Sequence, residues 1–458
     1  MRQDRQRRRD TPAADPGQPA SATPRGPETP LGRNRDFNLL WTGDAVSSLG
    51  TQISAIAYPL LILAATGSAA KAGIVGGAVL IGTLLTLLPA GVVADRYPRK
   101  RIMVISSLVQ MIVVGTVVPA VATHHVFIAH LATVGLIQGA AVAFYVGANR
   151  GSVRRIVPTT QLRTAQARIQ GREQASSLIG PPIGGTLFGL AKFLPFAFDA
   201  ISFGAIAVAA ALLRTPLDPD RDPDEIREPI RRSITKGSRY LLADPYLRTV
   251  VTWAAAINFI SAGMLLMVIV LARSRGATSL EIGALLSINA ACGLAGAFGA
   301  PRMIKLAGGR NLALTTSWLL PSCAVGIAFV PSIWLIGALG GLTTFTVMPV
   351  SILLLSRATQ ITPDELQAQT GNALRLFATS LSWVGPPGFG VLSDMIGTRR
   401  AILTAAGLYA ITAAWLQANR SLRDVDEQAV SPQTGPEQTS EAQPAAEQAA
   451  QAAPEQAS

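Results

Sequence analysis

The sequence Gly91-Val92-Val93-Ala94-Asp95-Arg96-Tyr97-Pro98-Arg99-Lys100-Arg101 joins two long apolar segments, residues 71–94 and 102–122. Asp95 and Arg96 stand where the first segment ends, and Arg99 to Arg101 stand where the second begins. A charged cluster between apolar segments of this length predicts a polar loop between two membrane-spanning helices. The loop alone leaves open whether its charges only orient the neighbouring helices or have a further role.

The composition of the whole chain supports a helical membrane protein. Of its 458 residues, 49% are hydrophobic and only 14% are charged, whereas a soluble protein carries roughly 25% charged residues. The charges gather in short clusters between apolar runs, and these runs are long enough to cross a bilayer as helices. Cys292 and Cys323 both lie in apolar runs and read as small buried side chains, because their spacing gives neither a zinc site nor a disulfide framework.

The apolar runs predict an all-α protein with twelve transmembrane helices in two halves of six. We place the spans at residues 38–65, 72–94, 102–122, 126–148, 166–190, 195–213, 247–271, 281–300, 311–330, 333–355, 366–391 and 400–418. The halves are then 35–213 and 247–418, joined by a polar linker at 214–246 with a short amphipathic helix near 225–242. The polar ends, 1–34 and 419–458, are predicted to be disordered cytoplasmic tails.

Basic residues are concentrated on one side of the predicted membrane. With the N-terminus on that side, its tails and loops hold 32 of the 39 Lys and Arg residues. Because cytoplasmic loops are enriched in Lys and Arg, both termini are predicted to be cytoplasmic, and the net charge of +12 needs no nucleic-acid partner. Arg375 is the basic residue left inside a span, and the opposite loops hold six: Lys71, Lys192, Arg273, Arg275, Arg399 and Arg400.

The two halves repeat each other. Gly180-Pro181-Pro182-Ile183-Gly184 in the fifth span recurs 205 residues later as Gly385-Pro386-Pro387-Gly388-Phe389-Gly390 in the eleventh. The same offset carries Gly91 onto Gly296, which opens a decayed copy of the charged loop with Ala300 in place of Asp95. Two six-helix repeats are typical of secondary transporters, whose substrate site lies between the halves near the bilayer midplane.

These motifs resemble those of the major facilitator superfamily. The charged loop matches the family's signature loop between spans 2 and 3 at Gly91, Asp95, Arg96, Arg99 and Lys100, while Pro98 replaces a glycine. In the fifth span the pattern Gly180-Pro181-x-x-Gly184-Gly185 resembles the motif of drug/proton antiporters. With Asn34-Arg35-Asp36-Phe37 before the first span and Asp199 in the sixth, the chain resembles the subgroup of enterobactin exporters and macrolide efflux proteins.

The resemblance implies a multi-pass transporter of the cell (inner or plasma) membrane that works by alternating access as a monomer, without a cofactor. It implies proton-coupled export of small molecules such as drugs, siderophores or secondary metabolites, and a role for Asp95 in docking on the first turn of the eleventh span. Thr362-Pro363-Asp364-Glu365 reads as a capping box at that turn. One departure concerns the fourth span, where many antiporters have an arginine four residues before a glycine. Here Gly139 is preceded at that spacing by Gly135.

Polar residues inside the spans are the candidates for the proton and substrate site. Asp44, Ser47, Ser48, Thr51 and Gln52 recur at helical spacing and share one face. In lipid such a face must look into protein or a water-filled cavity, and an intramembrane carboxylate is a functional candidate. The alternative is that the first span begins later and Asp44 lies among the headgroups.

Further candidates for the cavity lie on the fifth and eleventh spans: Glu173, Asn372 and Arg375. Arg375 is a candidate partner for Asp44 or for an anionic substrate, and Asp44, with Glu173 as second choice, is the candidate proton carrier. A second stretch with the look of the signature loop, residues 390–400, falls on the opposite side, and we interpret it as a local resemblance without a gating role. The alternative to a transporter is a membrane sensor or scaffold. No metal site, nucleotide-binding loop or nucleophile triad is evident, so an enzyme is not expected.

Overall fold

The computed structural model of this protein describes residues 30–217 and 230–419. These residues form helices joined by short loops, and no strand is present among them. Most of the predicted tails, 1–29 and 420–458, and the acidic part of the linker, 218–229, lie outside the described residues.

The first half follows the predicted spans closely. α3 and α4 together form one span that is interrupted at Thr116. Pro119 explains the break, because it has no N–H to donate to the carbonyl of Gly115 four residues earlier. The helices are α1 (Arg35–Thr66), α2 (Ala69–Arg96), α3 (Arg99–Gly115), α4 (Val117–Ala122), α5 (Ile128–Ile156), α6 (Leu162–Leu190) and α7 (Leu194–Ala211).

The second half repeats this arrangement. Its eleventh span is broken into α13, a short 3-10 helix η3 and α14, since Pro386 and Pro387 stand in the first turn of α14 and disfavour a continuous helix before them. A linker helix, α8, occupies part of the segment where one was expected. The helices are α8 (Ile230–Ala243), α9 (Pro245–Ser274), α10 (Ser279–Ala307), α11 (Gly309–Phe329), α12 (Ile333–Ile361), α13 (Asp364–Thr379), η3 (Ser382–Val384), α14 (Gly385–Ile396) and α15 (Thr398–Ala418).

Ten of the described spans, counting α3 with α4 as one, are long and apolar enough to cross a membrane by length and composition alone. The other two are α6 and the broken span formed by α13, η3 and α14. Both carry polar residues in their first halves, including Arg172 and Glu173 in α6 and Asn372 and Arg375 in α13. The two less apolar spans are therefore the ones that carry polar and charged residues in their first halves, and both contribute residues to the cavity described below.

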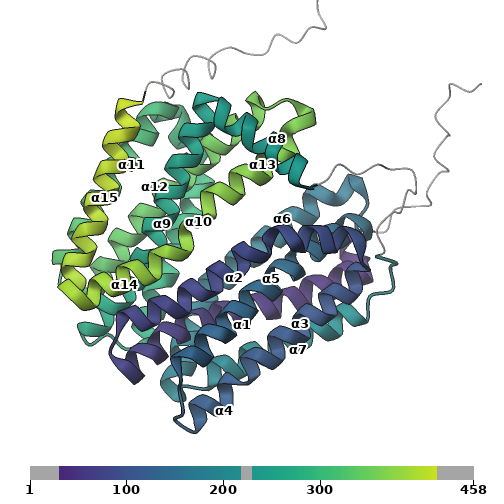
Figure 1. Cartoon of the computed structure of the whole chain (residues 1–458), viewed down its shortest axis with the longest axis horizontal. Helices are drawn as coiled ribbons and strands as arrows, with labels where there is room; N and C mark the ends of the chain where they lie inside the picture. Colours follow the sequence, from purple (N-terminus) through teal and green to yellow (C-terminus); the bar gives the residue numbers. More distant parts are fainter. Residues whose placement is uncertain (1–29, 218–229, 420–458) are drawn as a thin grey trace, which may run out of the picture.

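The two halves meet at one end of the bundle and separate at the other (Figure 1). Where they meet, α2 packs against α14 and α6 packs against α10. At the opposite end α13 packs on α8 and α9, and cavities lined by residues of both halves lie there. We call the end with the first turns of α2 and α10 the closed end, and the end with Asp95 and the first turn of α13 the open end.

Glycines bring backbones of opposite halves into direct contact at the closed end. A Cβ on Gly73 of α2 would lie 2.2 Å from the carbonyl oxygen of Pro386 in α14. A Cβ on Gly283 of α10 would lie 2.3 Å from the carbonyl oxygen of Pro181 in α6. A side chain has no room at such distances, so glycine alone permits this approach. Pro181 and Pro386 are equivalent in the 205-residue repeat, so the pseudo-symmetric halves meet through the same motif twice.

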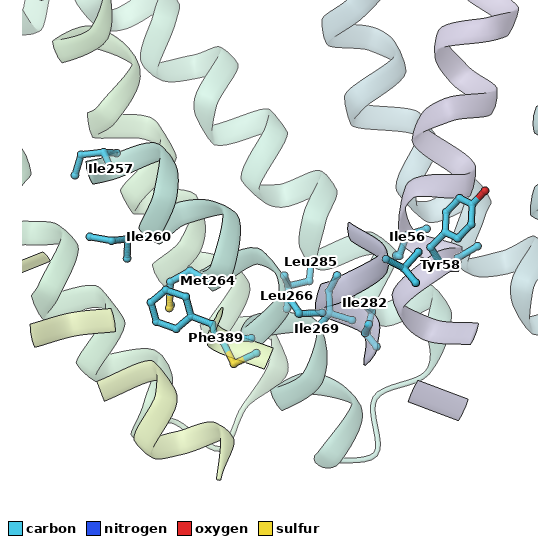
Figure 2. Packing of buried hydrophobic residues seen from close by; sticks show 14 of the residues in the cluster. Ile56, Tyr58, Ile257, Ile260, Met264, Leu266, Ile269, Ile282, Leu285 and Phe389 are labelled. Atoms are coloured by element: carbon cyan, nitrogen blue, oxygen red, sulfur yellow. The ribbon is translucent and has the colours of Figure 1, made fainter. Parts of the chain in front are cut away.

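Apolar side chains fill the space behind these two joints (Figure 2). The ring of Phe389 in α14 lies against α9, with its centroid 5.9 Å from that of Phe259. Gly263 of α9 leaves room for this ring, because a Cβ there would lie 2.1 Å from it. Ile282 and Leu285 of α10 are both fully buried. The closed end is thus sealed by close packing rather than by a single contact.

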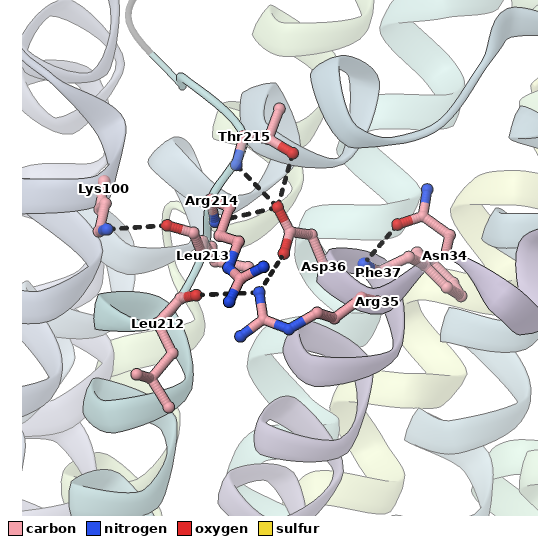
Figure 3. A network of polar contacts seen from close by, with 9 residues as sticks. All are labelled: Asn34, Arg35, Asp36, Phe37, Lys100, Leu212, Leu213, Arg214 and Thr215. Carbon is pink, nitrogen blue, oxygen red and sulfur yellow. Dashed lines mark hydrogen bonds and ion pairs between the residues drawn. The ribbon is translucent and has the colours of Figure 1, made fainter.

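A polar network at the open end ties together three helices of the first half (Figure 3). The Asp36 carboxylate, in the first turn of α1, accepts hydrogen bonds from the backbone N–H groups of Arg214 and Thr215 at 3.0 and 2.7 Å. Lys100 of α3 donates to the carbonyl oxygen of Leu213 at 2.8 Å, just past the end of α7. A cation beside unsatisfied carbonyls at a helix C-terminus is stabilising. Lys100 therefore has a packing role that the charged-loop pattern did not specify.

Candidate functional site: a cavity between the halves

A polar cavity of about 570 Å³ lies between the halves. Its wall is formed by α1, α3, α5, α6 and α7 of the first half and, through Arg375, by α13 of the second. Among the residues that line it are five charged side chains: Asp44, Arg150, Arg172, Glu173 and Arg375.

Two further cavities share lining residues with the polar cavity. An apolar cavity of about 370 Å³ is lined largely by α9, α10 and α12 and shares Gln52 with the polar cavity. A gate-side cavity of about 450 Å³ contains Gly91 and Asp95 of α2 and shares Arg150 and Arg375. The cavities between the halves therefore form a series: an apolar cavity, the polar cavity, and a cavity beside the charged loop that contains Asp95.

Asp44 is held in a buried polar cluster. Only 7% of its surface is exposed. Its Oδ1 accepts a hydrogen bond from the hydroxyl of Tyr145 at 2.5 Å, and its Oδ2 accepts one from Asn149 Nδ2 at 3.0 Å. Arg172 Nη1 lies 2.9 Å from Oδ2, and Arg172 Nη2 lies 3.7 Å from Glu173 Oε1. Because α1 begins at Arg35, Asp44 lies more than two turns inside the helix and not at its end.

The candidate residues selected from the sequence line two adjoining cavities, but Asp44 has a different ion-pair partner from the one expected. Asp44, Ser48, Gln52, Glu173 and Arg375 all line the polar cavity, and Asn372 lines the gate-side cavity. The expected pairing of Asp44 with Arg375 is absent from this structure, where Arg172 is the ion-pair partner of Asp44. Arg172 forms the ion pair because it lies on α6, which packs directly on α1 in the same half.

Three site residues were missed by the sequence analysis: Tyr145, Asn149 and Arg150. Arg172 was placed in the fifth span beside Glu173 but was not selected as a site residue. Arg150 was counted among the loop charges, but α5 continues to Ile156. Arg172 was also counted there, although the predicted fifth span, 166–190, already contained it. Arg375 is therefore not the one basic residue within the spans. The spacing of four between Tyr145 and Asn149 was the available signal, since it places both on one helix face.

The missing antiporter arginine has a steric explanation. A Cβ on Gly135 would lie 3.0 Å from Val79 Cγ2, and one on Gly139 would lie 2.1 Å from the carbonyl oxygen of Val79. α2 and α5 thus approach closely, and a side chain at position 135 would require Val79 to move. A buried guanidinium in the polar cavity comes from a different helix, at Arg172 of α6.

The charged loop divides into residues that face the cavity and residues that brace the fold. Gly91 and Asp95 line the gate-side cavity together with Asn372 and Arg375, and a Cβ on Gly91 would meet no atom within 4 Å. Arg99 Nη1 donates to the carbonyl oxygen of Gly151 at 3.4 Å, a long bond to α5.

Arg96, in the last turn of α2, is exposed.

The predicted capping box at α13 is wrong. Pro363 stands at the N-cap, and the Thr362 hydroxyl donates back to the carbonyl oxygen of Ala358.

The Gly-Pro motif of α6 packs on both halves. Cβ atoms on Gly180 and Gly184 would lie 2.4 Å from Gln52 Cβ and 2.6 Å from the carbonyl oxygen of Ile53, which brings α6 onto α1. A Cβ on Gly185 would lie 2.2 Å from the carbonyl oxygen of Ser279, at the start of α10 in the other half. The motif therefore fixes the cavity wall and contributes to the closed end.

The stretch at 390–400 has a contact that the sequence did not predict. The Asp394 carboxylate accepts hydrogen bonds from Ser68 Oγ at 2.6 Å and from the backbone N–H groups of Ala69 and Ala70 at 2.9 and 3.1 Å. An acidic side chain of α14 thus occupies the N-terminus of α2 in the other half, where a negative charge is stabilising. The sequence analysis did not predict this contact, and its interpretation that the stretch has no gating role stays a prediction. The repeat maps Asp394 onto Gly189, so the α6–α10 joint lacks the carboxylate.

Replacing Asp394 by Asn should loosen the closed end. Hydrogen bonds to charged groups contribute about 1.5–3 kcal/mol and neutral ones about half as much, so the equilibrium should shift towards separation by roughly tenfold. Spin labels at Lys192 and Met395, which are exposed on opposite halves, would report the separation as a longer interspin distance. Asp364→Asn, at the open end, is the matched control and should leave the distance unchanged. An unaltered distance in D394N would mean that glycine packing alone holds this end.

Comparisons with known proteins agree with this architecture. Residues 40–386 match the Major Facilitator Superfamily. The chain is 25% identical over 368 residues to the multidrug efflux pump Tap of Mycolicibacterium fortuitum, covering 77% of this chain and 88% of that protein. It is 25% identical over 382 residues to the enterobactin exporter EntS of Shigella flexneri, covering 78% and 89%.

Solved structures share the same fold at low sequence identity. A bacterial homologue of the human lysosomal transporter Spinster, in an inward-facing and unoccupied conformation, superposes with a TM-score of 0.71 at 13% identity and covers 87% of this chain and 99% of that one. A bacterial homologue of the iron transporter ferroportin gives a TM-score of 0.65 at 17% identity, covering 84% and 99%. With the family match spanning most of the described helices, the chain belongs to the Major Facilitator Superfamily, a family of membrane transporters rather than enzymes.

Proposed function

We propose that this protein is a proton-coupled exporter of small molecules that works by alternating access. The observation that carries the proposal is the buried Asp44–Arg172 pair in a cavity that lies between the halves and is closed at one end. Relatives named as a multidrug efflux pump and an enterobactin exporter support the direction of transport.

In this proposal Asp44 carries the proton and Arg172 responds to it. While Asp44 is ionised, it attracts the guanidinium 2.9 Å away. Protonation removes that attraction, and Arg172 is then drawn towards Glu173, at 3.7 Å, or towards an acidic group of the substrate. The proton affinity of Asp44 thus depends on where Arg172 lies, which links proton binding to a rearrangement of α1 against α6.

The distribution of basic residues supports the placement of the open end in the cytoplasm, with both termini on that side. The closed end holds few basic residues, among them Lys71 and Lys192, whereas Arg96, Arg99 and Lys100 lie at the open end. In the proposed cycle the substrate enters from the cytoplasm, and separation of α2 from α14 and of α6 from α10 releases it outside.

The alternative is a membrane sensor or scaffold that keeps the fold without transport. Such a protein does not need charged side chains inside the membrane, because they are costly there unless they are used. The cluster around Asp44 therefore favours the exporter.

An efflux assay tests the proposal directly. Cells lacking their main efflux pumps would produce the protein and be loaded with a panel that includes a macrolide, a tetracycline, a catechol siderophore and a fluorescent dye. We expect faster loss of at least one compound than in cells with an empty vector, and abolition of the difference by an uncoupler. Equal retention of every compound at matched protein levels would favour the sensor or scaffold, and export that survives the uncoupler would remove proton coupling.

A further inference from the structure

Arg150 and Arg375 face the same two cavities from opposite halves of the protein. Arg150 lies on α5 and Arg375 on α13, and both line the polar cavity and the gate-side cavity. Neither guanidinium forms a hydrogen bond or an ion pair with any residue in 30–217 or 230–419. The charge on Arg150 is close enough to Arg375 to be repelled by it, and close enough to Glu173 to be attracted.

The polar cavity carries more positive than negative groups. Three guanidinium groups line it, and its two carboxylates, Asp44 and Glu173, are both engaged by Arg172. Asp95 lines the gate-side cavity but not the polar one. With all five groups of the polar cavity ionised, one positive charge is left over, and Arg150 and Arg375 are the cations without a carboxylate in direct contact.

Arg172 also has hydrogen-bond donors without acceptors. Its side chain is 8% exposed, and its Nε and Nη1 have no hydrogen-bond acceptor among the described residues. The Nη1 atom is within ion-pair distance of Asp44 but is not oriented to donate to it. A buried donor without an acceptor is destabilising by about 1–3 kcal/mol. An incoming group with acceptor oxygens would relieve this cost.

The neighbouring apolar cavity could hold the apolar part of a ligand whose charged group lies in the polar cavity. Met264, Leu265, Val268 and Ile269 of α9 are among its lining residues, and Gln52 lines both this cavity and the polar one. A molecule with an apolar body and one acidic group would therefore fill both regions at once.

We propose that the substrate is an amphiphilic organic acid whose anionic group is bound between Arg150 and Arg375, with its apolar body in the cavity lined by α9. The proposal rests on the proposed exporter function and adds the substrate class to it. A bound anion attracts both arginines and offsets the repulsion between them. Because the two arginines belong to different halves, the anion then links the halves. Substrate binding then favours approach of the halves at the open end, which alternating access requires.

A matched pair of probes tests this inference. 8-Anilino-1-naphthalenesulfonate and N-phenyl-1-naphthylamine differ by the sulfonate alone. Their binding to the full chain in phosphatidylcholine nanodiscs would be measured by equilibrium dialysis, with empty nanodiscs to subtract lipid partitioning. We expect saturable binding of the sulfonate, tighter than that of the neutral probe by about tenfold or more, as loss of one charge-assisted bond implies.

Arginine variants locate the site. Arg150→Gln and Arg375→Gln should each weaken binding of the sulfonate by about tenfold and leave the neutral probe unchanged. Arg375→Lys should restore part of the loss. Arg400→Gln, an exposed arginine that lines none of the three cavities, is the control and should bind both probes like the parent.

Three results would overturn the inference: no saturable binding of the sulfonate, equal binding of both probes, or undiminished sulfonate binding by the two Gln variants. Displacement of the sulfonate when phosphatidylglycerol is added to the nanodiscs would assign the arginines to a lipid headgroup and overturn it as well. Dialysis requires no transport, so a protein that binds the sulfonate but exports nothing would lose the proposed function and keep this site.

Discussion

Asp44→Asn should abolish transport against a gradient while leaving some movement of substrate down its gradient. Asparagine keeps the shape of the side chain and an oxygen for the Tyr145 hydroxyl, but it cannot be ionised. Arg172 would lose its partner at 2.9 Å and remain as a buried charge. Removing one member of a buried pair typically destabilises the fold by about 3–5 kcal/mol. We expect uphill transport to fall to the background level of empty vesicles, because asparagine cannot bind and release the coupling proton.

Proteoliposomes with an imposed pH gradient are the measurement, with a compound identified by the efflux panel as substrate. Glu173→Gln is the matched control. Its carboxylate is more exposed and lies 3.7 Å from Arg172, so we expect a much smaller effect. If both variants pump like the parent, neither carboxylate carries the proton. Asp199 would be a poor replacement, because it is fully buried against Ser54 and lines none of the three cavities.

Gly73→Ala should force the closed end apart. The added methyl group would lie 2.2 Å from the carbonyl oxygen of Pro386 and 2.8 Å from the Cα of Pro387. All the nearest atoms are backbone, so no side chain can rotate away, and α2 and α14 must separate. Overpacking of this kind costs about 1–3 kcal/mol, which shifts the equilibrium between closed and separated forms by roughly ten- to a hundredfold.

Spin labels at Lys192 and Met395 would again report the change, as a longer interspin distance. Gly388→Ala is the matched control, because Gly388 lies in the same α14 segment and a Cβ there would meet nothing within 4 Å. The control should keep the parent distance and its transport. A parent-like distance in G73A would show that the helices slide past each other at little cost.

The spans, the two halves and the Gly-Pro motif that recurs in both could be predicted from the sequence alone. These features are local or repeated: an apolar run long enough to cross a bilayer is visible in one dimension, and so is a Gly-Pro motif that recurs after 205 residues. The polar face of α1 from Asp44 to Gln52 was also predictable, because helical periodicity alone defines it.

Tertiary structure decided which charges meet. Asp44 pairs with Arg172 and not with Arg375, and Asp394 reaches the first turn of α2, because interhelical packing brings together residues more than a hundred positions apart. Arg150 looked like a loop charge until α5 proved to extend to Ile156, beyond its apolar segment. Hydropathy identifies the apolar part of a helix but not the residue at which the helix ends. Polar turns at the end of a helix that face a cavity therefore look like loop residues in the sequence.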